Sequence, residues 1–387
     1  MFNRMLALVS ASLLTVATYA IAADLRADHP DTYVVKRGDT LWDISARFLN
    51  KPWLWPEIWQ ANPQVHNPHL IYPGDVLNLR YINGRPSVEM SRGNGEGEAI
   101  NAIPLSQVED LLKNLRVVDH PRDLPYVVGV EEDRNRVTSG MLAYARGVPS
   151  AQAGDMFAIF RPTVSYGRTH RGSGEYERRH NDLDMRGDLL NGVNWDDYWQ
   201  DVSFGREGER DYLGTEMKLL SLAQVTRPEG HGIETTTLLL LGEGVEVKVG
   251  DRLMPVEAQP FDLQFFPHPP KHPQDVSEYT KFRVIGVPDN LDAAAGPREV
   301  ISMSAGSDDQ VDNGTVFSVW RIGTNAMDRV AHHNKLAQDN DRVKLADEFE
   351  GHVMVFRTFN RMSYGLIMDG TKEVHVGDIL KHPDATR

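Results

Sequence analysis

The sequence YVVKRGDTLWDI, residues 33–44, reads as a short strand, a turn and the start of a helix. Alternating apolar residues indicate the strand. Gly38 indicates the turn, because glycine adopts a positive φ without steric cost. Thr40 and Asp43 have the spacing of a helix capping box. The apolar side chains that follow at helical spacing are Leu41, Ile44 and Phe48.

A second helix and a closing strand follow within the next 35 or so residues. The helix is expected from about Trp53 to Ala61, and Asn62-Pro63 ends it because the residue before a proline avoids the α region. Pro73-Gly74-Asp75 indicates a second turn, and Val76–Leu79 the closing strand. The predicted order is strand, helix, helix, strand.

These segments resemble the lysin motif (LysM), a βααβ module that binds N-acetylglucosamine-containing glycans. The resemblance implies a shallow sugar groove between the first strand–helix loop and the second helix–strand loop. Backbone groups there would pair with acetamido groups while apolar side chains cover the sugar. An alternative reading places Leu41, Ile44 and Ile71 in the core. The matching positions, which are the predicted glycan-binding residues, are Gly38, Asp39, Thr40, Leu41, Leu70, Ile71 and Tyr72.

The module is unusually rich in tryptophan. Because a small module cannot bury several indoles fully, at least one is expected at the surface. It could stack on sugar or contact the rest of the chain, and the sequence leaves both open. The four tryptophans fall within 18 positions, at Trp42, Trp53, Trp55 and Trp59.

The first residues predict export. A basic start at Arg4 precedes the apolar run Met5–Ala20, and Ala20-Ile21-Ala22 matches a signal-peptidase site. The run is short for a bilayer crossing, which needs about 20 residues, so we expect a cleavable signal peptide at 1–22. The alternative is an uncleaved anchor. The expected location is the periplasm, associated with the cell wall and without a transmembrane span after cleavage.

Composition narrows the function classes. The chain has 387 residues, enough for two or three domains, and a formal net charge of −14, which argues against a nucleic-acid partner. It has no cysteine, so disulfides, thiolate metal sites, a cysteine nucleophile and a lipidated N-terminal cysteine are excluded.

The expected fold class is multidomain α+β. The βααβ module at 31–81 is followed by a linker at 82–101 and by a β-rich C-terminal region. In that region we expect a first lobe at 102–262, interrupted by a long polar insertion at 165–214. A Pro-rich connector at 263–280 then leads to a second lobe at 281–387.

An internal repeat links the two lobes. Gly154–Arg161 corresponds to Gly314–Arg321, and Leu239–Leu253 corresponds to Leu366–Leu380. Each unit combines alternating strands with a Gly-Asp turn, which predicts two related small barrels or sandwiches. The turn carboxylates are expected to bond their own backbone rather than act in catalysis. They are Asp155, Asp251 and Asp378.

No motif predicts an enzyme. The chain lacks HExxH, GxSxG and a phosphate-binding Walker loop, and the histidines of Pro267–Pro273 and His332-His333 are expected to face solvent. We therefore predict no catalytic residue, no metal and no cofactor. The alternative is a LysM-targeted wall hydrolase, because paired carboxylates leave no sequence pattern.

The whole layout resembles the type IV pilus secretin-associated family, in which a LysM is joined to a domain related to the C-terminal part of flagellar assembly protein T. The second resemblance rests chiefly on Gly314–Arg321 and Val374–Leu380. It implies a non-enzymatic adaptor that binds peptidoglycan glycan strands and anchors an outer-membrane secretin, with a ring or other homo-oligomer as a further expectation. An acidic chain would be repelled by an anionic wall polymer, so attachment would depend on the specific sugar groove.

Overall fold

The computed structural model of the 387-residue chain places most of its elements. The residues that it describes are 25–60, 71–82, 85–93, 100, 104–168, 185–189, 212–230, 232–242, 244–256, 266–271, 282–288, 294–328, 330 and 342–385. The predicted signal peptide, Leu70, His272 and His332-His333 lie outside these residues.

The N-terminal module has the predicted order with one strand added. Its elements are β1 (Thr32–Val34), α1 (Leu41–Phe48), a 3-10 turn (Pro52–Leu54), α2 (Trp55–Gln60), β2 (Val76–Ile82) and β3 (Arg85–Ser91). The sheet order is β1-β2-β3. The added strand β3 lies inside the segment that sequence reasoning assigned to a linker. It pairs with β2 from Val76↔Ser91 to Ile82↔Arg85 and buries Val88 beneath the sheet.

The first curled sheet follows helix α3 (Leu105–Asn114), whose apolar residues Val108 and Leu112, four positions apart on one face, are buried. The sheet order is β4-β9-β10-β6-β5-β11-β7-β8, and an additional β9–β7 pairing closes its six central strands. The strands are β4 (Leu115–Val118), β5 (Tyr126–Val130), β6 (Leu142–Arg146), β7 (Met156–Arg168), β8 (Met185–Leu189), β9 (Tyr212–Arg227), β10 (Thr236–Leu241) and β11 (Arg252–Pro255).

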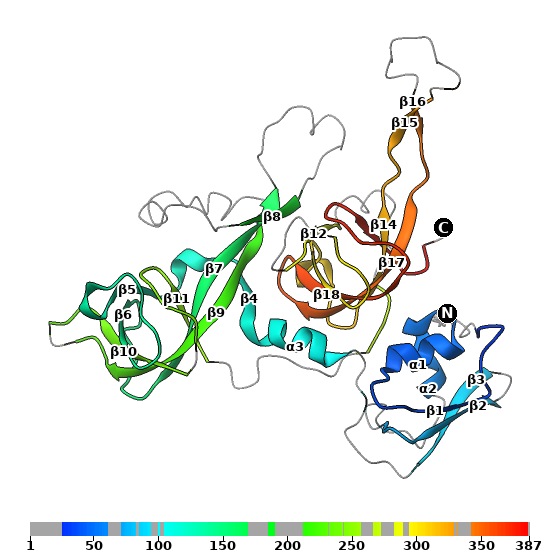
Figure 1. The fold of residues 1–387 in the computed structure, drawn as a ribbon, viewed down its shortest axis with the longest axis horizontal. Coiled ribbons are helices and arrows are strands. Elements are labelled where there is room, and N and C mark those ends of the chain that lie inside the picture. The colour runs from blue at the N-terminus through cyan, green and yellow to red at the C-terminus, as the bar shows by residue number, and fades with distance from the viewer. Residues whose placement is uncertain are drawn as a thin grey trace, which may run out of the picture.

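The second curled sheet has the order β12-β13-β18-β17-β14-β19, and a bridge between Arg283 and Ile379 joins its ends. Between β14 and β17 the chain forms a separate ribbon, β15–β16, that stands clear of the sheet (Figure 1). The elements are β12 (Val284–Gly286), β13 (Val300–Met303), β14 (Val316–Arg321), β15 (Asn325–Met327), β16 (Arg342–Lys344), β17 (Glu348–Thr358), β18 (Ser363–Gly370) and β19 (Ile379–Lys381).

The two sheets share one strand order. Reading β5-β6-β10-β9-β7-β11 against β12-β13-β18-β17-β14-β19 gives the same neighbours and the same order along the chain. Backbone hydrogen bonds also correspond: Val127 N–H donates to Asp251 O at 2.8 Å, and Val284 N–H donates to Asp378 O at 2.9 Å. A mostly β C-terminal region of curled sheets is therefore confirmed.

Each curled sheet encloses an apolar core of its own, built from the inward-facing residue of each alternating pair. The first contains Val127, Ala143, Ile159 and Leu238, and the second contains Val284, Ile301, Phe317 and Ile367. Among the described residues, no helix has the length and apolar character needed to cross a membrane.

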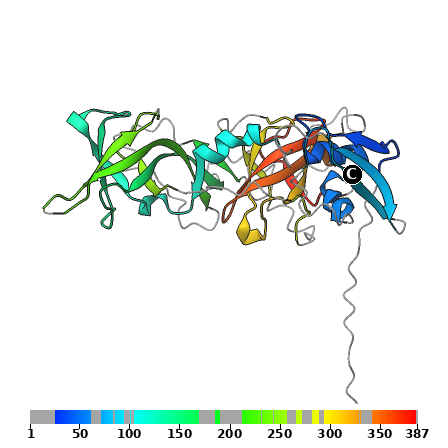
Figure 2. The same cartoon turned by 90° about the horizontal axis from the view of Figure 1, so that it is seen from below.

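The N-terminal module packs against the second sheet (Figure 2). The Trp53 ring lies 4.6 Å from the His352 ring, centroid to centroid, and the Trp55 ring lies 5.5 Å from that of Phe266. The Lys51 ammonium forms an ion pair of 2.6 Å with Asp384, next to the C-terminus.

This packing decides between the two readings of the tryptophan cluster. Trp42, Trp53 and Trp55 are all buried, within the module and against the second sheet. Trp53 and Trp55 contact the rest of the chain, Trp42 packs on Trp53 within the module, and none of the three is available to stack on sugar. The side chain of Trp59 lies outside the described part of the structure.

Trp53→Ala tests this contact. Removing a buried indole leaves a cavity and costs about 3–5 kcal/mol of folding free energy. We expect a large drop in melting temperature, measured by differential scanning calorimetry. Tyr81→Ala is the matched control, since Tyr81 is 63% exposed on the same module. Equal melting temperatures for the two variants would contradict the docking.

Candidate functional site

The two loops of the predicted sugar groove are built on the same turn. In the first, Asp39 accepts hydrogen bonds from the Lys36 N–H and the Tyr33 hydroxyl, both at 2.8 Å. In the second, the carboxylate of buried Asp75 accepts from the Tyr72 N–H and the Gly93 N–H, both at 3.0 Å. Each aspartate fixes the glycine turn that precedes it.

Backbone hydrogen bonds hold the two loops side by side. The Val35 N–H donates to Asp75 O at 2.9 Å, and the Gly74 N–H donates back to Val35 O at 2.8 Å. Gly38 and Gly74 have φ of +90° and +95°, and a Cβ at either would meet nothing within 4 Å. The glycines are thus needed for backbone conformation, and the loop surface over them is open.

The helix cap between the loops forms as predicted. Thr40 accepts from the Asp43 N–H at 3.1 Å and donates its hydroxyl to the Asp43 carboxylate at 2.9 Å. Since Thr40 is buried, its side chain serves α1. This cap fixes the end of α1 that borders the groove.

The predicted glycan-binding residues divide into a buried set and an exposed set. The side chains of Leu41 and Ile71 are 0% exposed, so they support the loops from the core, as the alternative reading held. Gly38 is exposed, and Asp39 and Tyr72 are half-buried. The structure therefore brings the two loops together and leaves these last three residues at the surface.

Two neighbours of the groove were missed from sequence. The Arg92 guanidinium lies 5.4 Å from the centroid of the Tyr72 ring, which adds a cationic donor beside the second loop. The Ile100 N–H donates to Ile71 O at 2.8 Å, so one carbonyl of this loop is already engaged by the chain itself. Both residues follow the predicted module in sequence, and no local pattern marks their return to it.

The Gly-Asp turns of the curled sheets use the same hydrogen bond as the groove loops. Asp155, Asp251 and Asp378 accept the N–H of the residue three positions earlier, at 2.8, 2.8 and 2.6 Å respectively. The interpretation of these carboxylates as turn residues is thereby confirmed.

An arginine anchors the turn of the first sheet. Arg161 donates through Nε and Nη2 to both carboxylate oxygens of Asp251, each at 2.8 Å, and also to Glu246 O at 2.8 Å. Burial raises the pKa of Asp251, and the bidentate arginine opposes that rise.

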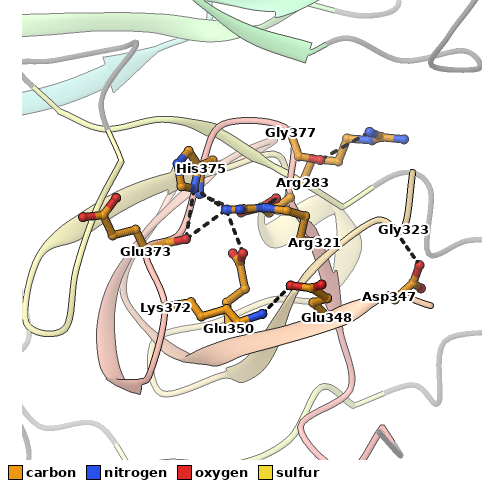
Figure 3. A network of polar contacts seen from close by, with 11 residues as sticks. Arg283, Arg321, Gly323, Asp347, Glu348, Glu350, Lys372, Glu373, His375 and Gly377 are labelled. Carbon is orange, nitrogen blue, oxygen red and sulfur yellow. Dashed lines mark hydrogen bonds and ion pairs between the residues drawn. The ribbon is translucent and has the colours of Figure 1, made fainter. Parts of the chain in front are cut away.

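The second sheet has an equivalent arginine, Arg321, with an additional carboxyl, Glu350, beside it (Figure 3). Arg321 contacts the Glu373 carbonyl at 3.0 Å and the His375 ring, while its Nε lies 3.7 Å from Asp378. Its Nη2 also lies 2.7 Å from Oε1 of Glu350, a side chain that is 0% exposed.

Glu350 stands where the first sheet has an apolar residue. It is a bulged residue of β17, because Val319 pairs with Gly351 and Trp320 pairs with Phe349. Leu220 is the bulged residue at the equivalent place in β9, between Leu219 and Ser221. His375 likewise takes the place of Lys248. At this position the second sheet therefore carries a buried carboxyl that the first sheet lacks.

The surroundings of Glu350 favour its neutral form. Burial, followed by the nearby Asp378 carboxyl, raises the pKa of Glu350 to about 8. Ligand atoms of Glu350, His375 and Asp378 lie within 4.8 Å of one another. The Arg321 guanidinium contacts the first two of these residues, so it supplies the positive charge of the group and the geometry favours an ion-pair network over a metal site.

Glu350→Leu, which restores the residue type of the first sheet, should change the pH dependence of stability. Between pH 4.5, the ordinary pKa, and about 8, folded Glu350 keeps a proton that the unfolded chain has released. Stability therefore falls as pH rises through this window. We expect the variant to be more stable at pH 8, by about 1 kcal/mol or more, with a flatter profile.

Melting temperatures of both proteins from pH 4.5 to 8.5 provide the measurement. Glu348→Gln is the control, because Glu348 is exposed on the same strand. Parallel profiles for wild type and Glu350→Leu would contradict the assignment.

Comparison with known proteins supports the N-terminal module. The family model for the LysM domain matches residues 33–80. Over 60 residues the chain is 37% identical to the uncharacterized protein YqbP of Bacillus subtilis strain 168, an alignment covering 13% of this chain and 27% of that protein. The chain thus spans about a quarter of that relative. A LysM domain implies binding to peptidoglycan or related N-acetylglucosamine glycans, and such domains are typically associated with the cell wall or envelope.

Proposed function

We propose that this protein is a non-enzymatic adaptor that attaches an envelope assembly to peptidoglycan. The observation that carries the proposal is the pair of Gly-Asp loops, tied together by backbone hydrogen bonds and open over Gly38 and Gly74, within a LysM domain. Backbone amides and carbonyls of these loops would pair with the acetamido groups of the glycan. Tyr72 and Arg92 would flank it.

Charge supports a specific groove over bulk adsorption. A net charge of −14 repels an anionic wall polymer, so binding would depend on short-range contacts with sugar. The buried residues of the predicted site, Thr40, Leu41 and Ile71, would act by holding the loops in place.

The two curled sheets would bind the envelope assembly. Their shared strand order and shared Gly-Asp turns favour two copies of one small barrel. The resemblance to the secretin-associated family makes a type IV pilus secretin the partner that we propose. Export through a signal peptide at 1–22 would place the protein in the periplasm.

Pelleting with purified peptidoglycan sacculi tests the wall-binding step. We compare the full-length protein with Tyr72→Ala/Arg92→Ala, which removes the two side chains that would flank the glycan, and with Tyr81→Ala, a control 63% exposed outside the groove. The groove variant should bind at least about tenfold more weakly, since hot-spot contacts each contribute above 1 kcal/mol. Equal pelleting of the groove variant would contradict the proposal.

The same preparation tests the competing wall-hydrolase function. Soluble muropeptides released from sacculi by the purified protein would favour a hydrolase. Their absence across pH and added divalent metals is the expected result. A secretin captured from detergent-solubilised membranes by the full-length protein would support the proposed partner.

A further inference from the structure

The ribbon β15–β16 has a counterpart in the first sheet. Beyond Arg161, the strands β7 and β9 continue as a ribbon in which Tyr166 pairs with Gly214 and Val164 with Glu216. Beyond the equivalent Arg321, the second ribbon has the same register: Ala326 pairs with Val343, and the Leu345 N–H donates to Thr324 O at 3.0 Å. The two ribbons correspond at these pairs, although β7–β9 also has register shifts at Pro162/Val164 and at Tyr166/Gly167.

The first ribbon is an internal docking element. The Tyr166 hydroxyl lies 3.0 Å from the Ser302 hydroxyl of β13. The Tyr364 hydroxyl of β18 donates to the Glu216 carboxylate at 2.6 Å. Arg361 donates to Tyr212 O at 2.7 Å. One face of this ribbon thus packs against the outer face of the second sheet. The residues that define this face are Val164, Tyr166, Gly214 and Glu216.

The same face of the second ribbon lies open. Its members are Thr324, Ala326, Val343 and Leu345, and the side chains of Val343 and Leu345 are each 48% exposed. In Figure 1 this ribbon points away from both curled sheets. Two neighbouring aliphatic side chains on an extended two-stranded ribbon favour a protein partner.

The first sheet, in turn, has a partly open copy of the docking face. The positions equivalent to Ile285, Ser302 and Tyr364 are Val128, Tyr144 and Thr237, from the correspondences of β12 with β5, β13 with β6 and β18 with β10. Val128 is 39% exposed, Tyr144 is half-exposed and Thr237 is buried, whereas Ile285, Ser302 and Tyr364 are all buried.

We propose that the second ribbon of one copy docks on the Val128–Tyr144 face of the first sheet of another copy. The contact would reproduce between chains the interface that already joins the two sheets within one chain. The ribbon and the face that would receive it are different surfaces, so the contact is heterologous. Repeating this contact from copy to copy yields a ring or a filament. This self-association stands independently of glycan binding.

Sedimentation velocity of the mature full-length protein over a range of concentrations tests the proposal. Wild type should form species larger than a monomer as concentration rises. Val343→Glu/Leu345→Glu on the ribbon and Val128→Glu on the face should each weaken association at least about tenfold, because each would bury an unpaired charge. Val245→Glu is the control, since Val245 is 54% exposed elsewhere on the first sheet.

Mixing the two disabled variants identifies the type of contact. Each keeps one intact surface, so an equimolar mixture should form a heterodimer and nothing larger. A mixture that stays monomeric, a wild type that is monomeric throughout, or ribbon variants that associate like wild type would each overturn the proposal. Far-ultraviolet circular dichroism confirms that the variants are folded.

A covalent trap gives a second measurement that does not depend on disabling the contact. The chain has no cysteine, so Ala326→Cys and Tyr144→Cys, the equivalents of Tyr166 and Ser302, can be introduced singly and mixed under mild oxidation. A disulfide-linked heterodimer on non-reducing gels is expected. Crosslinking no greater than for Ala326→Cys mixed with Val245→Cys would count against the docking.

Discussion

One hydrogen bond recurs throughout this protein: an aspartate after a glycine accepts the N–H of the residue three positions earlier. It closes both groove loops, through Asp39 and Asp75, and it closes turns in both curled sheets. Because the bond is local, it forms at low entropic cost and sets where the next strand begins. The loops of the predicted sugar groove and the turns of the curled sheets therefore depend on the same hydrogen bond.

The two curled sheets share this turn but differ in the residues that surround it. Arg161 and Arg321 occupy the same place and contact the same turn, yet Arg321 also contacts a buried carboxyl, Glu350, whose position in the first sheet is taken by Leu220. A buried carboxyl beside another acid is costly unless it is neutral or paired. The first sheet fills this position with an apolar side chain, whereas the second sheet places a titratable carboxyl there.

Sequence reasoning succeeded where the physics is local. The Thr40 cap, the Gly-Asp turns and the helical stripe of α1 depend on residues a few positions apart. It could not resolve the role of the tryptophans, because Trp53 is buried against His352, about 300 positions away. Strand β3 and the return of Ile100 to Ile71 were missed for the same reason: each is defined by its partner and not by its own pattern.

The ion pair between Lys51 and Asp384 brings the first folded module to the last residues of the chain. A pull on the N-terminal module would therefore pass directly into the second sheet through the Trp53 contact. The buried tryptophans would resist such a pull together with the ion pair, so the module and the second sheet can move apart only after both contacts break.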